Sequence, residues 1–136
     1  MSAVDLALPR LKTEEGFRAR AYKDTNGFTT VGYGFNVDAG ITPYAAAALL
    51  QAQSEELQQA LTRYPWYAAL DDARQSVCLD IAVNEGIGGL LRFPHMIAAL
   101  AKQDWTTAAA ECQVQDPKLA SRYAALAQIL LTGVIA

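Results

Sequence analysis

The chain has 136 residues, which is enough for one domain with a hydrophobic core. Hydrophobic residues make up 52% and charged residues 18% of the chain, so its composition excludes an intrinsically disordered protein. The net charge of −3 is spread without a basic stripe, which disfavours nucleic-acid binding, and no apolar run reaches the roughly 18 residues of a membrane-spanning helix.

Three features indicate where the protein is made and whether it binds a metal: its first residues, its two cysteines and its single histidine. The N-terminal segment lacks the basic and long apolar regions of a signal peptide, so we expect synthesis in a cytoplasm. Cys78 and Cys112 stand in apolar helical contexts, which favours buried free thiols over a disulfide. With one histidine, His95, and no metal-ligand spacing of the cysteines, the sequence disfavours a zinc site.

The first predicted element is a helix over residues 3–15. Pro9 has no amide proton, so we expect the helix to be broken there or to start there. Gly16 follows Glu15 directly, at the position that glycine favours just after a helix. The helix is therefore predicted to end at Glu15.

Strands and a long helix are predicted next. Residues 19–36 contain aromatic and β-branched residues in short runs between glycines, which indicates strands. A clear helix follows, with Thr42 as its N-cap and Pro43 in its first turn, and it runs until shortly before Pro65.

The rest of the chain is predicted to be helical. Asp72 and Gln75 resemble a capping box at the start of one helix. Further helices are expected near Pro94, over a short alanine-rich segment, and from Asp116 to Gly133. The pattern as a whole predicts an α+β fold, mostly α, with a small hairpin region between an N-terminal helix and a helical bundle.

The stretch YKDTNGFTTVGYG, residues 22–34, places a carboxylate and hydroxyls around one turn. Its Asn-Gly pair is a strong hairpin signal. A two-residue loop would pair Asp24 with Thr29, whereas a three-residue loop with Gly27 in a left-handed bulge position would pair Asp24 with Phe28. Hydrophobicity does not choose between these registers, but acid–base chemistry favours the three-residue loop. In that register four side chains share one face: Tyr22, Asp24, Phe28 and Thr30.

Two carboxyl groups flank this region of the sequence. Glu15 is expected at the negative end of a helix dipole and next to Glu14, and both influences favour its protonated form. Asp24, among backbone amides and hydroxyls, is expected to stay ionised. Two carboxyls kept in different protonation states suit general acid–base chemistry, as in glycoside hydrolysis. Glutamates at helix ends and aspartates before Asn-Gly are also common for local reasons, so spacing alone leaves both interpretations open.

The stretch EEGFRARAYKDTNGFTTVGYG resembles the signature of the phage-type lysozymes, a family of glycoside hydrolases. That signature has Glu-Gly, an aspartate nine residues after the glutamate, a threonine six residues after the aspartate, and Gly-x-Gly. Here these residues are Glu15, Asp24, Thr30 and the glycines of 32–34. Later segments also resemble the family's helices, so the resemblance covers nearly the whole chain.

The resemblance implies a single lysozyme-like domain over residues 1–136 with two lobes. Residues 16–41 would form a small β region. Residues 1–15 and 66–136 would form a helical lobe, and the helix over residues 43–63 would join the two.

The resemblance also implies an activity, that of an endolysin or muramidase. The protein would hydrolyse the β-1,4 bond between N-acetylmuramic acid and N-acetylglucosamine in bacterial peptidoglycan. Glu15 would protonate the leaving glycosidic oxygen, Asp24 would act as base or electrostatic partner for an attacking water, and Thr30 would help to hold that water. No cofactor is implied.

Supporting residues follow from the same resemblance. Arg122 falls about where the family has an arginine facing the catalytic glutamate, so it would pair with Glu15. Asn84 and Asn36 are candidates for sugar binding, but both are equally well explained as helix and loop caps.

The chain departs from the family pattern in three respects. Phe35 stands where the family often has histidine. The segment between Gly34 and Thr42 is short, which predicts a reduced β region. The chain is acidic, whereas many phage lysozymes are basic, so electrostatic steering toward the anionic wall would be weak or adverse.

Two other functions stay open. A lytic transglycosylase needs one acid–base carboxyl and no water-holding pair, and a non-catalytic module on this fold would bind the wall or an inhibitor. For the lysozyme and for the transglycosylase alike, the expected partner is peptidoglycan. The protein is expected to act as a monomer, to bind no nucleic acid and not to insert into a membrane. The protein would be made in the host cytoplasm and act on the cell wall after release.

Overall fold

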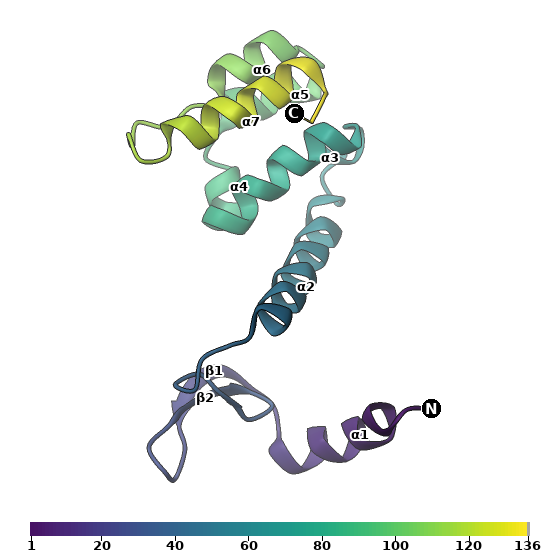
Figure 1. Ribbon diagram of the computed structural model, residues 1–136. Helices are drawn as coiled ribbons and strands as arrows, with labels where there is room; N and C mark the ends of the chain where they lie inside the picture. The colour runs from purple at the N-terminus through teal and green to yellow at the C-terminus, as the bar shows by residue number, and fades with distance from the viewer. Residues whose placement is uncertain (136) are drawn as a thin grey trace. The chain divides into compact units, whose positions relative to one another are not determined.

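The structure is a computed structural model that describes residues 1–135 (Figure 1). The described residues form seven helices and one three-stranded antiparallel sheet, which confirms the predicted α+β, mostly α, fold. The chain divides into two compact units, a first unit of Met1–Ala48 and a second unit of Leu49–Ala136. The predicted grouping of residues 1–15 with residues 66–136 in one lobe stays a prediction. Among the described residues, each helix is too short or too polar to span a bilayer.

Helix α1 (Ala3–Glu15) opens the first unit with a capping box. The Ser2 hydroxyl accepts a hydrogen bond from the Asp5 N–H, and the Asp5 carboxylate accepts one from the Ser2 N–H, both at 3.1 Å. The helix then passes through Pro9, so the expectation of a break or a start at Pro9 is wrong. The reason is that the capping box fixes the first turn upstream of the proline, and the helix continues at the cost of one backbone hydrogen bond.

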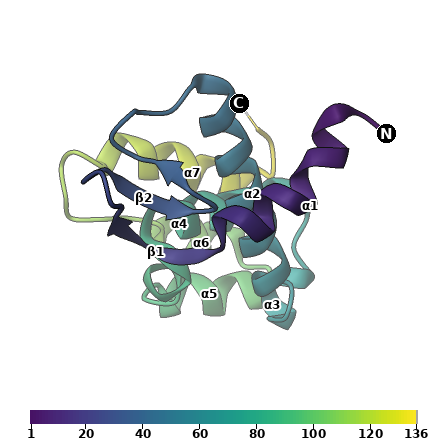
Figure 2. The same cartoon turned by 90° about the horizontal axis from the view of Figure 1, so that it is seen from below.

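The sheet follows α1 and contains three strands in the order β1-β2-β3: β1 (Arg18–Lys23), β2 (Thr29–Gly32) and β3 (Phe35–Asn36) (Figure 2). Tyr22 lies opposite Thr30, and the Asp24 N–H donates to the Phe28 carbonyl at 2.9 Å. Gly27 has a φ of +84°, which closes a three-residue loop. The three-residue register is therefore confirmed, and the two-residue alternative is wrong.

Helix α2 (Pro43–Leu61) begins in the first unit and ends in the second. The Thr42 hydroxyl accepts a hydrogen bond from the Ala45 N–H at 3.2 Å, so Thr42 caps the helix as predicted.

The second unit contains five further helices: α3 (Pro65–Ala68), α4 (Asp72–Leu90), α5 (Pro94–Ala101), α6 (Trp105–Glu111) and α7 (Ala120–Thr132). The N-cap of α4 is Asp71, whose carboxylate accepts from the Arg74 N–H at 2.9 Å, so the predicted capping box at Asp72 is wrong by one residue. Helix α7 begins later than predicted, because the Asp116 carboxylate accepts from the Lys118 N–H and holds the intervening residues in a turn.

Sixteen hydrophobic residues are buried among the described residues, and all belong to the second unit: Leu61, Tyr67, Leu70, Val77, Cys78, Ile81, Ala82, Leu90, Met96, Ala99, Leu100, Ala108, Cys112, Tyr123, Leu126 and Leu130. Both cysteines are free thiols in this core. Burial disfavours the thiolate and raises the pKa of Cys78 to about 12 and that of Cys112 to about 11.

Arg74 is the one buried charged residue in the described chain. Its Nε donates to the Leu130 carbonyl at 2.8 Å, its Nη1 pairs with Asp71 at 2.6 Å, and its guanidinium lies 3.8 Å from the centroid of the Trp105 ring. Gly133 ends α7 with a φ of +70°, as predicted, and a Cβ there would lie 2.8 Å from the Arg74 Nη1. Arg74 thus joins α4 to the end of α7 and to α6.

Candidate active site

Glu15 is the last residue of α1, as predicted. Gly16 has a φ of +68°, and its N–H donates to the Lys12 carbonyl at 3.0 Å, which ends the helix. The Glu15 side chain is exposed, and neither ion pair of the described chain involves it. Glu15 therefore offers an accessible carboxyl at the negative end of a helix.

The turn between β2 and β3 lies against this carboxyl. Gly34 has a φ of +76°, and a Cβ added to it would lie 3.0 Å from Glu15 Cδ and closer still to Oε2. The preceding Tyr33 ring packs on Phe17 at 5.6 Å between centroids and lies 6.0 Å from the Lys12 ammonium. Gly34 is thus required both for its backbone conformation and for the space it leaves to Glu15. The Gly-x-Gly motif was visible in the sequence, but its contact with Glu15 was not.

Asp24 follows β1 and is fixed by the backbone of its own turn. Its Oδ1 accepts hydrogen bonds from the N–H groups of Asn26 and Phe28, both at 2.9 Å. Within residues 1–135 its Oδ2 has no hydrogen-bond or ion-pair partner. One carboxylate oxygen is therefore held in place while the other is left to accept a hydrogen bond from a ligand.

Thr30 lies on β2 and is tied to the same backbone segment. Its side chain is 4% exposed, and its hydroxyl donates to the Phe28 carbonyl at 3.2 Å. The Phe28 backbone thus binds both Asp24 and Thr30. Because the Thr30 hydroxyl proton is already used, its oxygen is left as an acceptor.

Arg122, the predicted partner of Glu15, lies on α7 in the second unit. Its guanidinium donates to the Asp80 carboxylate, with Nε 3.0 Å from Oδ1. This hydrogen bond raises the pKa of Arg122 above its ordinary value, and the charge of Asp80 adds to the effect. The pairing of Arg122 with Glu15 stays a prediction.

The two asparagines have different surroundings. The Asn36 side chain accepts from the Ala39 N–H at 3.2 Å, so in this structure it caps a loop, one of the two roles considered for it. Asn84 is exposed on α4, two residues before Gly86, where a φ of +78° interrupts the helix. Sugar binding by either residue stays a prediction.

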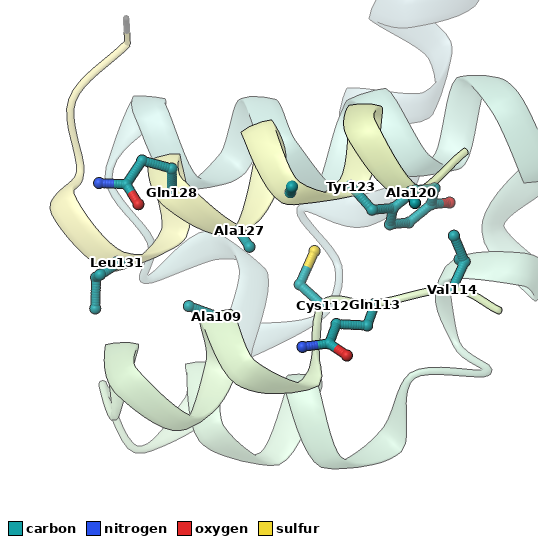
Figure 3. Close-up of a pocket in the computed structure, with 10 residues that line it drawn as sticks. Ala109, Cys112, Gln113, Val114, Ala120, Tyr123, Ala127, Gln128 and Leu131 are labelled. Atoms are coloured by element: carbon teal, nitrogen blue, oxygen red, sulfur yellow. The ribbon is translucent and has the colours of Figure 1, made fainter. Parts of the chain in front are cut away.

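A pocket of about 350 Å³ in the second unit lies between α6 and α7 (Figure 3). Cys112 and Gln113 line one side, and Tyr123 and Ala127 line the other. The Tyr123 hydroxyl donates to Glu85 at 3.2 Å, and burial together with that carboxylate raises the pKa of Tyr123 to about 12. Among the described residues that line the pocket there is no aspartate or glutamate, so it offers no acid–base pair.

Comparison with known proteins identifies the family. The family model described as phage lysozyme matches residues 12–125. The chain belongs to the phage lysozyme family. The matched part of the chain includes Glu15, Asp24, Thr30 and Arg122, and it spans residues of both units.

The chain is also similar to the pre-baseplate central spike protein Gp5 of Enterobacteria phage T4. The two are 23% identical over an alignment of 155 positions, gaps included, and the alignment covers 90% of this chain. The chain spans 27% of the length of that protein, so the similarity concerns one part of a much longer polypeptide.

Proposed function

We propose that this protein hydrolyses the β-1,4 bond between N-acetylmuramic acid and N-acetylglucosamine in peptidoglycan. The observation that carries the proposal is the contrast between two carboxyls of the first unit. Glu15 is accessible at a helix end, whereas Asp24 is fixed by two backbone N–H groups. Membership of the phage lysozyme family supports the same conclusion.

Glu15 is the proposed general acid. Its carboxyl gives a proton to the glycosidic oxygen as the bond from that oxygen to the muramic acid C1 breaks. The close approach of Gly34 leaves room for the carboxyl and limits where it can move on that side.

Asp24 and Thr30 are proposed to orient the attacking water. The Asp24 Oδ2 and the Thr30 oxygen can both act as acceptors, so one water can donate a hydrogen to each of them. Its lone pairs are then directed away from both acceptors and toward C1 of the sugar. As the new C–O bond forms, the water gives up one proton, which Asp24 takes as a base. In its alternative role Asp24 stays ionised and stabilises the positive charge that develops on the sugar, and the proton of the water passes to bulk solvent.

The test is the chemistry of the products. Purified peptidoglycan is digested in water enriched in oxygen-18, and the fragments are analysed by mass spectrometry. Hydrolysis puts one heavy oxygen on the reducing muramic acid end. Unlabelled 1,6-anhydro ends would show a lytic transglycosylase instead, and an undigested wall would show a binding module.

The remaining expectations are proposals too. We propose that the protein acts as a monomer, is made in the host cytoplasm and reaches the wall after release.

A further inference from the structure

Arg18 lies over an aromatic ring on the face of the sheet that carries the proposed water-binding residues. Its guanidinium carbon is 4.2 Å from the centroid of the Tyr22 ring. Tyr22 lies opposite Thr30 in the register of β1 and β2, so both side chains rise from the same face. The Arg18 guanidinium is therefore held beside the proposed site.

The contact exists because β1 is irregular. Arg18 pairs with Gly32 and Tyr22 pairs with Thr30, so four steps along β1 correspond to two steps along β2. In a regular strand two residues four apart are separated by about 13 Å, which is too far for this stacking. The bulge shortens that separation, and it gives Arg18 a position that a regular strand would not.

The donors of Arg18 are free to bind a ligand. The two ion pairs of the described chain are Arg74–Asp71 and Arg122–Asp80, and Arg18 is exposed. Stacking on Tyr22 orients the guanidinium plane while leaving its N–H groups available at the edge. By contrast, Lys23 on the same strand already donates to the Thr29 hydroxyl at 2.7 Å.

We propose that Arg18 binds a carboxylate of the wall polymer beside the bond that is cleaved. A guanidinium presents two parallel N–H groups that match the two oxygens of a carboxylate. The peptides attached to muramic acid carry such carboxylates, and chemical or enzymatic amidation removes their charge. This inference rests on the proposed function and names the substrate form that the site prefers, namely a wall with free carboxylates.

The experiment compares two soluble peptidoglycan preparations, one with free carboxyls and one in which the same carboxyls are amidated. Steady-state kinetics are measured for the wild type, Arg18→Gln, Arg18→Lys and Arg20→Gln. Arg20 is the matched control, because it lies exposed on the same strand and its substitution changes the net charge equally. Tyr22→Phe and Tyr22→Leu test the ring that orients Arg18, and circular dichroism monitors folding.

The wild type is expected to have a KM about tenfold lower on the free-carboxyl wall than on the amidated wall. One charge-assisted hydrogen-bonded pair contributes a difference in binding of about this size. Arg18→Gln should lose this preference through KM, with kcat within twofold, and Arg18→Lys should retain part of it. Arg20→Gln and Tyr22→Phe should behave like the wild type, and Tyr22→Leu should lose part of the preference.

Two results would overturn the inference. An equal loss on both walls in Arg18→Gln would show that Arg18 supports the sheet and does not recognise a carboxylate. Equal KM values of the wild type on both walls would exclude the recognition directly. If the wild type cleaves neither wall, the proposed function fails first and this inference with it, so the two failures are distinguishable.

Discussion

Each of the two units of the chain is stabilised by a different kind of interaction. Thr30 is the one buried residue in the first unit, whose residues 1–48 are all described, whereas the described part of the second unit contains the whole buried hydrophobic core. The first unit is held by the backbone pairing of its three-stranded sheet and by hydrogen bonds of turns and caps, such as those of Asp24 and Ser2. The candidate catalytic residues therefore lie in the unit where few side chains are fixed by packing, whereas the hydrophobic burial that stabilises the fold lies in the second unit.

The units also differ in charge. The first unit has five basic and five acidic side chains, and the second has six basic and nine acidic ones. The net charge of −3 therefore belongs to the second unit. The unit proposed to contact the anionic wall most closely is neutral, so the repulsion expected from the overall charge does not apply to it in full.

The largest expected effect on stability comes from Arg74. Arg74→Met should lower the free energy of unfolding by about 3 kcal/mol, because it leaves the Leu130 carbonyl unsatisfied and removes the pair with Asp71. Chemical denaturation gives the value. Arg63→Met, at an exposed position, should change stability by less than about 0.5 kcal/mol.

The same variant tests the division between the units. The folded fraction of Arg74→Met should keep the specific activity of the wild type, because Arg74 belongs to the second unit and not to the proposed catalytic group. A folded Arg74→Met protein without activity would show that the division is wrong.

Thr30→Val should reduce kcat by about thirtyfold, a loss in the range of one hydrogen bond made in the transition state. Valine keeps the shape of threonine but cannot accept a hydrogen bond from water. The matched control is Thr29→Val on the same strand, where the hydroxyl accepts from Lys23 and has no proposed role in catalysis. Equal activities of the two variants on peptidoglycan would remove Thr30 from the mechanism.

Gly34→Ala should reduce activity about tenfold by displacing the Glu15 carboxyl, a modest cost for misplacing a catalytic group. Gly32→Ala is the control, because Gly32 also has a positive φ, +67°, but a Cβ there meets nothing within 4 Å. Both variants should lose about 1 kcal/mol of stability from backbone strain. If their activities fall equally, strain explains the loss and the contact with Glu15 does not.

The smallest expected effect concerns the two thiols of the core. Their folded pKa values of about 12 and about 11 lie above the ordinary value, so the thiolate is favoured in the unfolded chain. The stabilisation is complete below the ordinary pKa of a thiol and is lost as the pH rises above it. From pH 7 to pH 9 each thiol should reduce the free energy of unfolding by about 0.8 kcal/mol.

Denaturation curves at several pH values test this dependence. Cys112→Ala should show a shallower decrease between pH 7 and pH 9 than the wild type. Identical slopes would mean that the Cys112 thiol is not shielded from water in the folded protein.

Local signals in the sequence predicted much of the fold. Gly16, Gly27, Thr42 and Gly133 each act through the conformation or the hydrogen bonds of adjacent residues, and each was placed correctly. The prediction for Pro9 is wrong, because the effect of a proline depends on whether a cap upstream has already started the helix. The break at Gly86 was not predicted either, since an isolated glycine in a helical pattern is usually tolerated.

Contacts between distant residues could not be predicted in the same way. The face shared by Asp24 and Thr30 followed from the turn, but the approach of Gly34 to Glu15 depends on how α1 meets the sheet. The hydrogen bond from Arg74 to Leu130 joins residues 56 apart, and no periodicity points to it. The stacking of Arg18 on Tyr22 depends on a bulge that leaves no clear sequence signal.

The central claim is that a carboxyl of the first unit, Glu15, is the proton donor of a peptidoglycan hydrolase. The most direct measurement is the initial rate of purified peptidoglycan digestion by Glu15→Gln beside Glu14→Gln, the adjacent glutamate with the same change of charge. Both variants should keep the circular dichroism and unfolding midpoint of the wild type, because both side chains are exposed. The account predicts a loss of about 100-fold or more for Glu15→Gln and a rate within about twofold of the wild type for Glu14→Gln. A folded Glu15→Gln protein that digests the wall at the wild-type rate would contradict it.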